Sequence, residues 1–293
     1  MTENQLFKLS IIIVSYNSLN YLRDCLDSIN NNKPSASFEI TVVDNASSDG
    51  TVKAMRKDYP YLKLIENARN KGFAAANNMA IKSSSSEYIL LINSDCRVYA
   101  NSIDRLLEFA DANDDAGIAG PRIINNDGSL QFSCRKFPSF FDAGMHSLLT
   151  NIAPDNPFSR RYKLTDINRD EISKVDWVSG SCMLIRRAAL NDTGLMDEKY
   201  FMYVEDTDLC YQMWKKGWKV YYFPESEILH HIGGSTKNNA LSGAVTSSIR
   251  MQKSVLYFFW KNYRKTLKVL LLPLLLMLLG IRIFLTFIKN LLK

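Results

Sequence analysis

Side chains that can hold a metal ion or move a proton occur at four separated places in this 293-residue chain. Asp44 follows the apolar segment FEITVV, and Asp95 ends the triplet NSD that follows EYILLI. Glu205 and Asp206 begin a segment with helical spacing, and His230 lies before a Gly-containing segment. Mg²⁺ and Mn²⁺ favour carboxylate oxygens together with substrate phosphates, histidine can bind a metal or a phosphate, and a positioned carboxylate can act as a general base.

Each of these places also has a simple structural explanation. DNASSDG can be a helix-capping loop, NSD is a common turn triplet, and carboxylates such as Asp208 are expected near a helix N-terminus because of the helix dipole. Among the tryptophans, Trp214 is at helical spacing from Cys210, which favours the core, whereas Trp177 beside Gly180 is the better candidate for stacking on a sugar or base. No single motif decides between the structural and the chemical roles.

The first ninety residues predict alternating strands and helices, because short apolar runs alternate with segments of helical spacing. The predicted strands are 9–15, 38–43, 61–65 and 87–92. Helices are predicted over 19–31 and 72–82, and a further helix is predicted to be capped by Ser48 or Asp49 and to continue through Arg56. This order is typical of a parallel sheet, in which ligands bind beyond the carboxyl ends of the strands. Tyr16-Asn17, Asp44-Asn45 and Asn93-Ser94-Asp95 follow predicted strands, so we expect these three clusters to meet at one edge.

The second half of the chain is less regular. Residues 130–174 contain many polar and Pro positions and predict a loop-rich insertion. Further on, the sequence predicts a strand and a helix start within 175–190, a helix over 204–216, a strand over 219–223 and a loop over 230–236.

The net charge of +6 comes from the C-terminal part of the chain. No Asp or Glu follows Glu227, whereas residues 228–293 contain ten Lys or Arg, so residues 1–227 carry a net charge of −4. Basic residues beside apolar runs indicate anionic lipid head groups as a partner. No nucleic-acid partner is expected, because the basic residues are not interleaved on a recognition fold.

Residues 254–292 are mostly apolar, yet the unbroken run 269–281 has only 13 residues. A membrane-spanning helix needs about 20 apolar residues, and Arg282 would be costly at the bilayer centre. We therefore predict one or two helices that lie in the membrane interface, with a tilted span over about 267–288 as the alternative. The predicted division is a catalytic domain over 1–250 and a membrane-associating helical segment over 251–293.

Cysteine usage and the N-terminus indicate a reducing compartment. The five cysteines form no CxxC pair, which argues against a disulfide framework or a zinc site. The first ten residues, MTENQLFKLS, lack the basic and then apolar pattern of a signal peptide. We expect the protein at the cytoplasmic face of the cell membrane, either peripheral or anchored by its C-terminus.

Seven motifs in one order carry a family resemblance. These are SIIIVSYNS, VVDNASSDGT, NKGFAAANN, LLINSD, WVSGSCMLIRR, GLMDEKYFMYVEDTDLCYQMWKKGW and ILHHIGGST, and the resemblance spans roughly residues 9–260. The series resembles the family-2 inverting glycosyltransferases of the GT-A fold, and within them the rhamnosyltransferase-like branch that builds cell-surface polysaccharides. The resemblance implies an α/β fold with a mostly parallel central sheet, followed here by amphipathic or hydrophobic C-terminal helices.

The resemblance also implies roles for individual residues. Asp206 would be the catalytic base, and Asp95 and His230 would hold Mg²⁺ or Mn²⁺, although the family's DxD signature reads NSD here and lacks its first carboxylate. Arg250 would lie near the donor. The implied nucleotide and donor residues are Ser15, Tyr16, Asn17, Asp44, Asn45, Gly72, Phe73, Asn77 and Asn93. The implied sugar and acceptor residues are Trp177, Gly180, Ser181 and Glu205.

The implied reaction is a single in-line displacement that inverts the anomeric carbon. The base takes a proton from the acceptor hydroxyl, and the departing diphosphate is stabilised electrostatically. The first expectation for the donor is dTDP-rhamnose, with UDP-galactofuranose, UDP-glucose and UDP-N-acetylglucosamine as alternatives. The expected acceptor is a glycan or a polyprenyl-diphosphate-linked sugar.

Two rival functions differ in class. A sugar-nucleotide pyrophosphorylase would begin with a Gly-rich basic loop, whereas the first loop here reads SYNSLNYL. An inactive membrane-bound scaffold is the non-enzyme alternative, and the joint presence of Asp44, Asp95, Asp206 and His230 argues against it.

Overall fold

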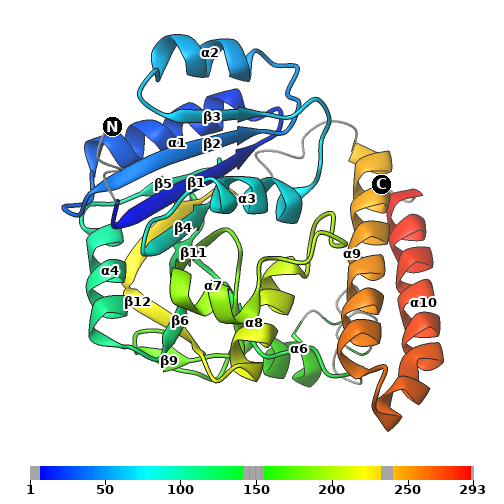
Figure 1. The fold of residues 1–293 in the computed structure, drawn as a ribbon. Coiled ribbons are helices and arrows are strands. Elements are labelled where there is room, and N and C mark those ends of the chain that lie inside the picture. The colour runs from blue at the N-terminus through cyan, green and yellow to red at the C-terminus, as the bar shows by residue number, and fades with distance from the viewer. Residues whose placement is uncertain are drawn as a thin grey trace.

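The fold is described from a computed structural model that covers residues 7–140, 145, 149, 153, 155–231 and 240–291. Its centre is a sheet with the strand order β3-β2-β1-β4-β11-β6-β12-β5, with helices on both faces (Figure 1). In the first ninety residues the strands are β1 (Leu9–Ser15), β2 (Phe38–Asp44), β3 (Lys63–Glu66) and β4 (Tyr88–Ile92), which all pair in parallel. The helices between them are α1 (Leu19–Asn31), α2 (Thr51–Asp58) and α3 (Phe73–Lys82).

Strand β1 explains why this half of the chain folds as predicted. Its apolar, β-branched residues are buried on both faces of the sheet, which is typical of a central parallel strand. Ile11 and Ile13 pack with α1, α2 and α4 on one face, whereas Ile12 packs with α3, α7 and α8 on the other. The predicted parallel arrangement is confirmed, and element ends differ from the predictions by one or two residues. Helix α2 begins after Gly50 at the N-cap, and Asp49 accepts a hydrogen bond from the Thr51 N–H at 3.2 Å.

The second half adds strands to the same sheet. The additional strands are β5 (Cys96–Val98), β6 (Ala116–Ile124), β7 (Leu130–Gln131), β9 (Ser173–Lys174), β11 (Cys182–Arg186) and β12 (Lys219–His230), and β8 (Cys134–Arg135) with β10 (Trp177–Val178) forms a separate two-stranded ribbon. The helices here are α4 (Ser102–Ala112), α6 (Pro157–Lys163), α7 (Arg187–Thr193) and α8 (Glu205–Lys215). Strand β11 is antiparallel to β4 and β6, and β12 is parallel to β6.

Two predictions in this half need correction. The strand predicted over 219–223 continues to His230, because β12 passes through an irregularity between Phe223 and Glu227 and then pairs again with β6. His230 therefore ends a strand and does not begin a loop, while residues 232–236 lie outside the described residues. Helix α4 and strand β6 were not predicted at all.

Two C-terminal helices stand side by side against one flank of the sheet domain (Figure 1). They are α9 (Ala240–Tyr263) and α10 (Leu272–Leu291), joined through the short 3₁₀ helix η1 (Leu267–Leu271). An apolar cluster separate from those on the two faces of the sheet joins them to the domain. In it Tyr200 and Val204 pack against Phe258, Phe259, Leu275 and Leu279. Across the part of the chain that is described, no helix combines the length and apolarity needed to cross a membrane. Helix α9 continues through position 250, and the division into domains at this position stays a prediction.

Candidate active site

Asp95 and His230 lie side by side although 135 positions separate them in the sequence. The Oδ1 atom of Asp95 is 3.2 Å from the Nε2 atom of His230, and the His231 N–H donates to the Asp95 carbonyl at 2.9 Å. The pairing of β12 with β5 produces this contact, because His230 is the register partner of Cys96. One carboxylate oxygen and one imidazole nitrogen therefore face each other at the carboxyl end of β4, a donor set that suits Mn²⁺ or Mg²⁺.

Gln131 orients the imidazole of His230. Its Nε2 donates to the His230 carbonyl at 2.8 Å and to Asn125 Oδ1 at 2.7 Å, so its Oε1 is left to accept from Nδ1 of His230 at 3.0 Å. With the proton on Nδ1, the Nε2 lone pair points towards Asp95 and is available to a cation. Cys96 lies close enough to be considered as a third ligand. Burial raises the pKa of its thiol far above the ordinary value, and the thiol donates to the Ser181 carbonyl at 3.3 Å, so it stays protonated.

The loop after β1 is bound to the loop after β2. The Asn17 N–H donates to Ser47 Oγ at 2.9 Å, and the Asn17 side chain accepts from the Ser48 N–H at 2.7 Å. Asn17 adopts a positive φ of 52°, a conformation that Asn tolerates better than most residues. Tyr16 is 44% exposed beside it. These contacts fix the two loops that were predicted to border the nucleotide.

A row of hydroxyl groups connects this edge to the Asp95 loop. Ser15 Oγ lies 3.0 Å from Ser18 Oγ, which lies 2.9 Å from Ser94 Oγ. All three side chains are buried. The carboxyl ends of β1 and β4 are thus held together through side chains as well as through the sheet.

Asp44 has one carboxylate oxygen in use and one without a protein partner. Its Oδ2 accepts from the Ser47 N–H at 3.0 Å, whereas Oδ1 is buried and has no hydrogen-bond partner among the described residues. A buried carboxylate oxygen without a partner is costly, which makes it a candidate acceptor for a ligand N–H or O–H.

Asn45 and Gly72 join the neighbouring loop to this edge. Asn45 donates to the Gly72 carbonyl at 3.1 Å and accepts from the Lys71 N–H at 3.2 Å. Gly72 has a φ of +86°, and a Cβ atom there would lie 2.2 Å from the Phe201 carbonyl oxygen. That oxygen accepts a hydrogen bond from the Phe73 N–H at 2.8 Å. Only glycine fits this close approach of two backbone segments.

Asn77, Asn93 and Ser181 make internal contacts in the same region. The Asn77 side chain donates to the Phe73 carbonyl at 3.0 Å within α3. The Asn93 N–H donates to the Ser181 carbonyl at 2.9 Å, which connects the Asp95 loop to the Gly180-Ser181 turn. Their predicted roles at the donor and acceptor stay predictions.

Asp206 is held at the start of α8 by backbone donors. Its Oδ2 accepts from the Gly180 N–H at 2.9 Å, and its Oδ1 accepts from the Thr207 N–H at 2.7 Å. A Cβ atom on Gly180 would lie 3.4 Å from the Phe73 ring and 3.5 Å from Asp206 Cβ, so these three predicted residues are neighbours. Burial raises the pKa of the Asp206 carboxyl above its ordinary value, although the two N–H groups and the Arg135 charge act in the opposite direction. A carboxylate with a raised pKa is a stronger proton acceptor.

Glu205 lies deeper than Asp206. It is buried, and within the part of the chain that the structure describes its Oε2 has no hydrogen-bond partner. Burial and then the neighbouring Asp206 charge raise the pKa of Glu205 well above its ordinary value. Asp206, by contrast, accepts from two backbone N–H groups, which favour its charged form.

Helix α9 contacts the segment 197–204, which leads into Asp206. The Arg250 guanidinium lies 4.8 Å from the centre of the Phe201 ring, and the Ser254 hydroxyl donates to the Met202 carbonyl at 3.1 Å. Because Phe201 also binds the backbone of Phe73, Arg250 reaches the neighbourhood of the predicted donor residues through that ring.

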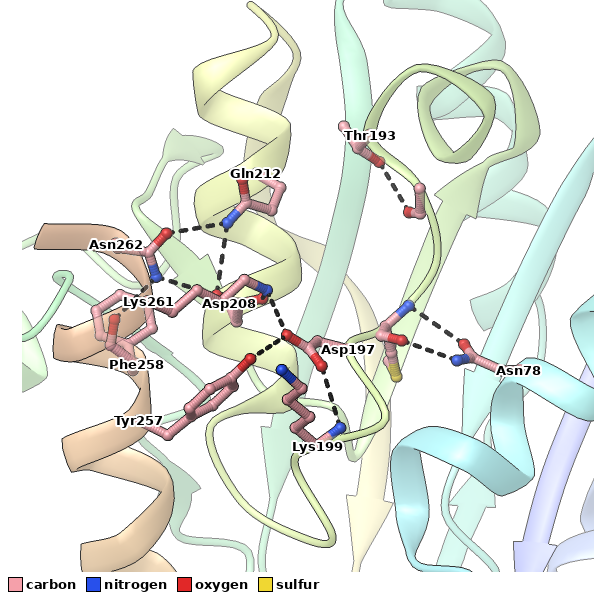
Figure 2. A network of polar contacts seen from close by, with 12 residues as sticks. Asn78, Thr193, Asp197, Lys199, Asp208, Gln212, Tyr257, Phe258, Lys261 and Asn262 are labelled. Carbon is pink, nitrogen blue, oxygen red and sulfur yellow. Dashed lines mark hydrogen bonds and ion pairs between the residues drawn. The ribbon is translucent and has the colours of Figure 1, made fainter. Parts of the chain in front are cut away.

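A polar network then binds α9 to α8, the helix that begins with Glu205 and Asp206 (Figure 2). Lys261 Nζ lies 2.6 Å from Asp208 Oδ2 and 2.8 Å from Asp197 Oδ2. The Tyr257 hydroxyl donates to Asp197 at 2.9 Å, and Asn262 donates to Asp208 at 3.1 Å. Burial acts to lower the pKa of Lys261, but its bonds to the two carboxylates outweigh this and raise it. The charged Lys261 therefore joins the segment before Asp206 to the helix that carries it.

Trp177 is buried in the described structure and covered by an arginine. Its indole N–H donates to the Lys136 carbonyl at 2.9 Å, and the Arg135 guanidinium lies 5.4 Å from the centre of its ring. The contacts above connect Asp44, Asp95, Asp206 and His230 through neighbouring loops at the carboxyl edge of the sheet.

Comparison with known proteins places this geometry in a family. Residues 10–194 match the family model described as glycosyl transferase family 2. The chain belongs to glycosyl transferase family 2. An N-acetylglucosaminyl-diphospho-decaprenol L-rhamnosyltransferase of Mycobacterium tuberculosis is 36% identical over 214 residues, which cover 69% of each chain. This relationship and the family match show that the protein is a glycosyltransferase.

Other relatives extend the comparison. The rhamnosyltransferase WbbL of Escherichia coli is 27% identical over 75% of this chain and 82% of its own length. The dTDP-rhamnosyl transferase RfbF of Shigella flexneri is 28% identical over 66% of this chain and 60% of its own length. Among solved structures, the mannosyltransferase PcManGT of Pyrobaculum calidifontis, in complex with GDP-Man and Mn²⁺, superposes with a TM-score of 0.60 at 18% identity, covering 95% of this chain and 74% of that one. The GT-A fold expected from the sequence is thereby confirmed.

Three residues of this region were not predicted from the sequence. Gln131 and Arg135 lie in the insertion that was read only as loop-rich, and Lys261 lies in the segment that was assigned to the membrane. A polar residue in an insertion and a lysine in a basic tail carry no local signal. The contacts that give them their positions join Gln131 to His230 and Lys261 to Asp208, which are 99 and 53 positions apart.

Proposed function

We propose that this glycosyltransferase transfers L-rhamnose from dTDP-L-rhamnose to a hydroxyl group of a lipid-linked or polysaccharide acceptor, with inversion at the anomeric carbon. The single observation that supports this assignment most is the 36% identity to the mycobacterial L-rhamnosyltransferase over 69% of both chains. The two further rhamnosyltransferase relatives agree with it. UDP-galactofuranose, UDP-glucose and UDP-N-acetylglucosamine are the alternative donors.

In this proposal Asp95 and His230 hold a divalent cation, Mn²⁺ or Mg²⁺. The 3.2 Å approach of Asp95 Oδ1 to His230 Nε2 and the orientation of the imidazole by Gln131 support a metal site. A bound cation would supply stabilisation of the negative charge that develops on the leaving diphosphate. The Asp95 loop is hydrogen-bonded both to the residue after β12 and to the Gly180-Ser181 turn. The chain's own residues therefore fix the place at which the charge of the leaving diphosphate would be stabilised.

Asp206 is the proposed general base. It accepts the proton of the acceptor hydroxyl as that oxygen attacks the anomeric carbon, and the Gly180 and Thr207 N–H groups hold the carboxylate in place. The absence of a side chain at Gly180 leaves space next to the Phe73 ring and Asp206, which supports a donor sugar close to these two residues. The free Oδ1 of Asp44 supports its role as acceptor for the base or ribose of the nucleotide, and Ser15, Tyr16 and Asn17 would border the same group.

An Asp206→Asn variant tests the base. We expect it to bind dTDP and the donor normally and to lose about 10²- to 10⁴-fold in transfer rate, since general-base catalysis contributes about that much. Full transfer activity in this variant would remove Asp206 from the role.

A donor screen tests the substrate. The purified protein is incubated with Mn²⁺ or Mg²⁺, each candidate nucleotide sugar and an N-acetylglucosaminyl-diphosphate-lipid acceptor, and released nucleotide is measured. dTDP release from dTDP-L-rhamnose is the expected result. A clear preference for a UDP-sugar would replace the donor, and the absence of both turnover and nucleotide binding would favour the scaffold alternative.

The proposal places the enzyme peripherally at the cytoplasmic face of the membrane. Large apolar side chains are exposed along η1 and α10, and residues 228–293 contain ten basic and no acidic residues, which supports contact with anionic lipids. The exposed set includes Leu267, Leu270, Leu274, Leu276, Met277 and Phe284.

Removing the whole tail would be a poor test of membrane contact, because Leu275 and Leu279 are buried against the domain. Charged substitutions at exposed positions are cleaner. Leu270→Glu combined with Phe284→Glu should weaken flotation with vesicles that contain anionic phosphatidylglycerol and leave donor hydrolysis unchanged. Unaltered flotation of this variant would contradict the membrane surface as a partner.

A further inference from the structure

The segment 196–204 leads into the candidate base and is fastened at its start to α3. Asn78 of α3 is buried, its Nδ2 donates to the Met196 carbonyl at 2.8 Å, and its Oδ1 accepts from the Met196 N–H at 3.2 Å (Figure 2). Helix α3 also carries Phe73, whose N–H donates to the Phe201 carbonyl at 2.8 Å. The beginning and the middle of the segment are therefore fixed to a helix that contains predicted donor residues.

Lys261 of α9 joins the start of this segment to the first turn of α8. Its Nζ lies 2.8 Å from Asp197 Oδ2 and 2.6 Å from Asp208 Oδ2, so that one cation holds two carboxylates (Figure 2). The Tyr257 hydroxyl donates to the same Asp197 oxygen at 2.9 Å. These two residues of α9 therefore close the loop 197–208 at its ends, which removes conformations that the loop would otherwise adopt.

The first turn of α8 receives no side-chain cap from its N-cap residue, Val204, in the described structure. Val204 has a φ of 71°, and Tyr203 before it has a φ of 73°. Such conformations persist only where the surrounding structure enforces them. The position of Asp206 in that turn therefore depends on tertiary contacts such as those of Lys261 and Tyr257.

The placement of Asp206 matters for proton transfer more than for nucleotide binding. Its Oδ2 accepts from the Gly180 N–H at 2.9 Å, which aims the carboxylate. A general base must lie within hydrogen-bond reach of the proton that it takes, and a misplacement of about 1 Å can cost about 10²-fold in rate. The nucleotide, by contrast, is proposed to bind at the ends of β1 and β2, with which α9 has no contact among the described hydrogen bonds and ion pairs.

We propose that Lys261 and Tyr257 of α9 are positioning residues for the transfer reaction. Through Asp197 and Asp208 they hold the Asp206 carboxylate at the place where it meets the acceptor hydroxyl. This inference rests on the proposed function, because it takes Asp206 as the base. The alternative is that the two residues only stabilise the fold. A folded variant distinguishes the two roles, because only a positioning role lowers kcat while nucleotide binding stays intact.

The first test compares Lys261→Met with Leu106→Ala at a temperature at which circular dichroism shows both variants to be folded. Leu106 is buried in α4 on the other face of the sheet, so its truncation leaves a cavity and lowers stability away from Asp206. With dTDP-L-rhamnose and an N-acetylglucosaminyl-diphosphate-lipid acceptor, we expect kcat to fall about 10- to 100-fold in Lys261→Met and to stay unchanged in Leu106→Ala. The dissociation constant of dTDP should stay unchanged in both. Equal kcat values in the two variants would overturn the proposal.

A double-mutant cycle connects the effect to the base. In an Asp206→Asn background, Lys261→Met should lower kcat by no more than about twofold, because the group that it positions is already disabled. An equal fold loss in both backgrounds would show that Lys261 acts elsewhere and would overturn the proposal. If Lys261→Met does not fold, Tyr257→Phe removes only one donor to Asp197. We expect it to lower kcat about 3- to 10-fold with unchanged dTDP binding, and an unchanged kcat would contradict the positioning role.

Hydrogen exchange keeps the proposal testable if the wild type transfers no sugar or if Asp206→Asn is fully active, which would be failures of the proposed function. The Gly180 N–H is protected by its bond to Asp206 Oδ2. Peptides that contain Gly180 or residues 203–208 should exchange faster in Lys261→Met than in the wild type and in Leu106→Ala. Equal exchange of these peptides in the wild type and in Lys261→Met would show that α9 does not position Asp206.

Discussion

Replacing Lys261 by methionine should destabilise the protein through two carboxylates that the substitution leaves without their cation. Lys261 Nζ lies 2.6 Å from Asp208 and 2.8 Å from Asp197, and the Asp208 side chain is only 3% exposed. Methionine retains much of the apolar stem but removes the charge and all three donors. The perturbation therefore separates the ion pairs from most of the packing of α9 against the domain.

The size of the effect follows from the burial of the partners. Removing one partner of a buried ion pair costs about 3–5 kcal/mol, because the other charge is left buried and uncompensated. Lys261 is itself 27% exposed and Asn262 still donates to Asp208, so we expect the lower end, about 3 kcal/mol. For a chain of this size, that corresponds to a fall in the melting temperature of roughly 5 °C.

Thermal and urea unfolding at pH 7 measure this loss, with Lys253→Met as control. Lys253 is exposed on the same helix, and its substitution should change stability by less than about 0.5 kcal/mol. Adding Asp208→Asn to Lys261→Met should recover part of the loss, because it removes the uncompensated charge. Equal melting temperatures for the Lys261 and Lys253 variants would refute the reasoning.

The pH dependence of the loss gives an independent check. Burial acts to raise the pKa of Asp197, but the Lys261 bond and its other donors outweigh this and lower it in the folded state. A carboxyl group with a lowered folded pKa contributes stability above its unfolded pKa and loses it as the pH falls through the folded value. The gap between wild type and Lys261→Met should thus be full at pH 7 and shrink below the ordinary Asp value of 3.8.

Three further changes test separate parts of the site. Gly72→Ala should lower the unfolding free energy by at least about 2 kcal/mol more than Gly50→Ala in urea titrations, because both positions have positive φ but only at Gly72 would the added Cβ lie 2.2 Å from a backbone oxygen; equal losses would contradict the close approach. Gln131→Ala should weaken activation of transfer by Mn²⁺ about 10- to 100-fold, since it frees the imidazole that Gln131 orients; an unchanged Mn²⁺ titration would exclude this role. The acidic limb of the kcat/KM profile should lie above pH 3.8, because Asp206 must be deprotonated and burial raises its pKa; a limb at or below 3.8 would assign the limb to another group.

The sequence predicted the first half of the fold because its signals are local. Strand β1 and helix α1 follow from apolar runs and helical spacing, and the residues after β1, β2 and β4 meet at one edge as expected of parallel strands. Strand β6 was missed because AGIAGPRII contains two glycines and a proline, and Gly120 is needed there for close contact with Val178. The prediction ended strand β12 at Phe223, whereas the chain continues past Pro224 through an irregularity to His230.

The partners of the candidate site residues were harder to predict than the residues. Asp95 and His230 were named from their types and from the family resemblance, but their 3.2 Å contact depends on β12 pairing with β5 across the sheet. Gln131 and Arg135 belong to an insertion whose sequence has no period, and their positions depend on the short strands β7 and β8. Such contacts arise from tertiary pairing, which local patterns do not encode.

Helix α9 supports the segment before Asp206 and, through it, the proposed base. Tyr203 and Val204 both have positive φ, at 73° and 71°, and a β-branched residue there costs about 1–3 kcal/mol. This strain has to be offset by contacts around it, and most of the described ones come from α9. Val204 is buried with Phe258 and Phe259, Ser254 binds the Met202 carbonyl, and Lys261 joins Asp197 to Asp208. Because the strained residues directly precede the Glu205-Asp206 pair, the conformation of the proposed base depends on a helix that the sequence alone assigned to the membrane.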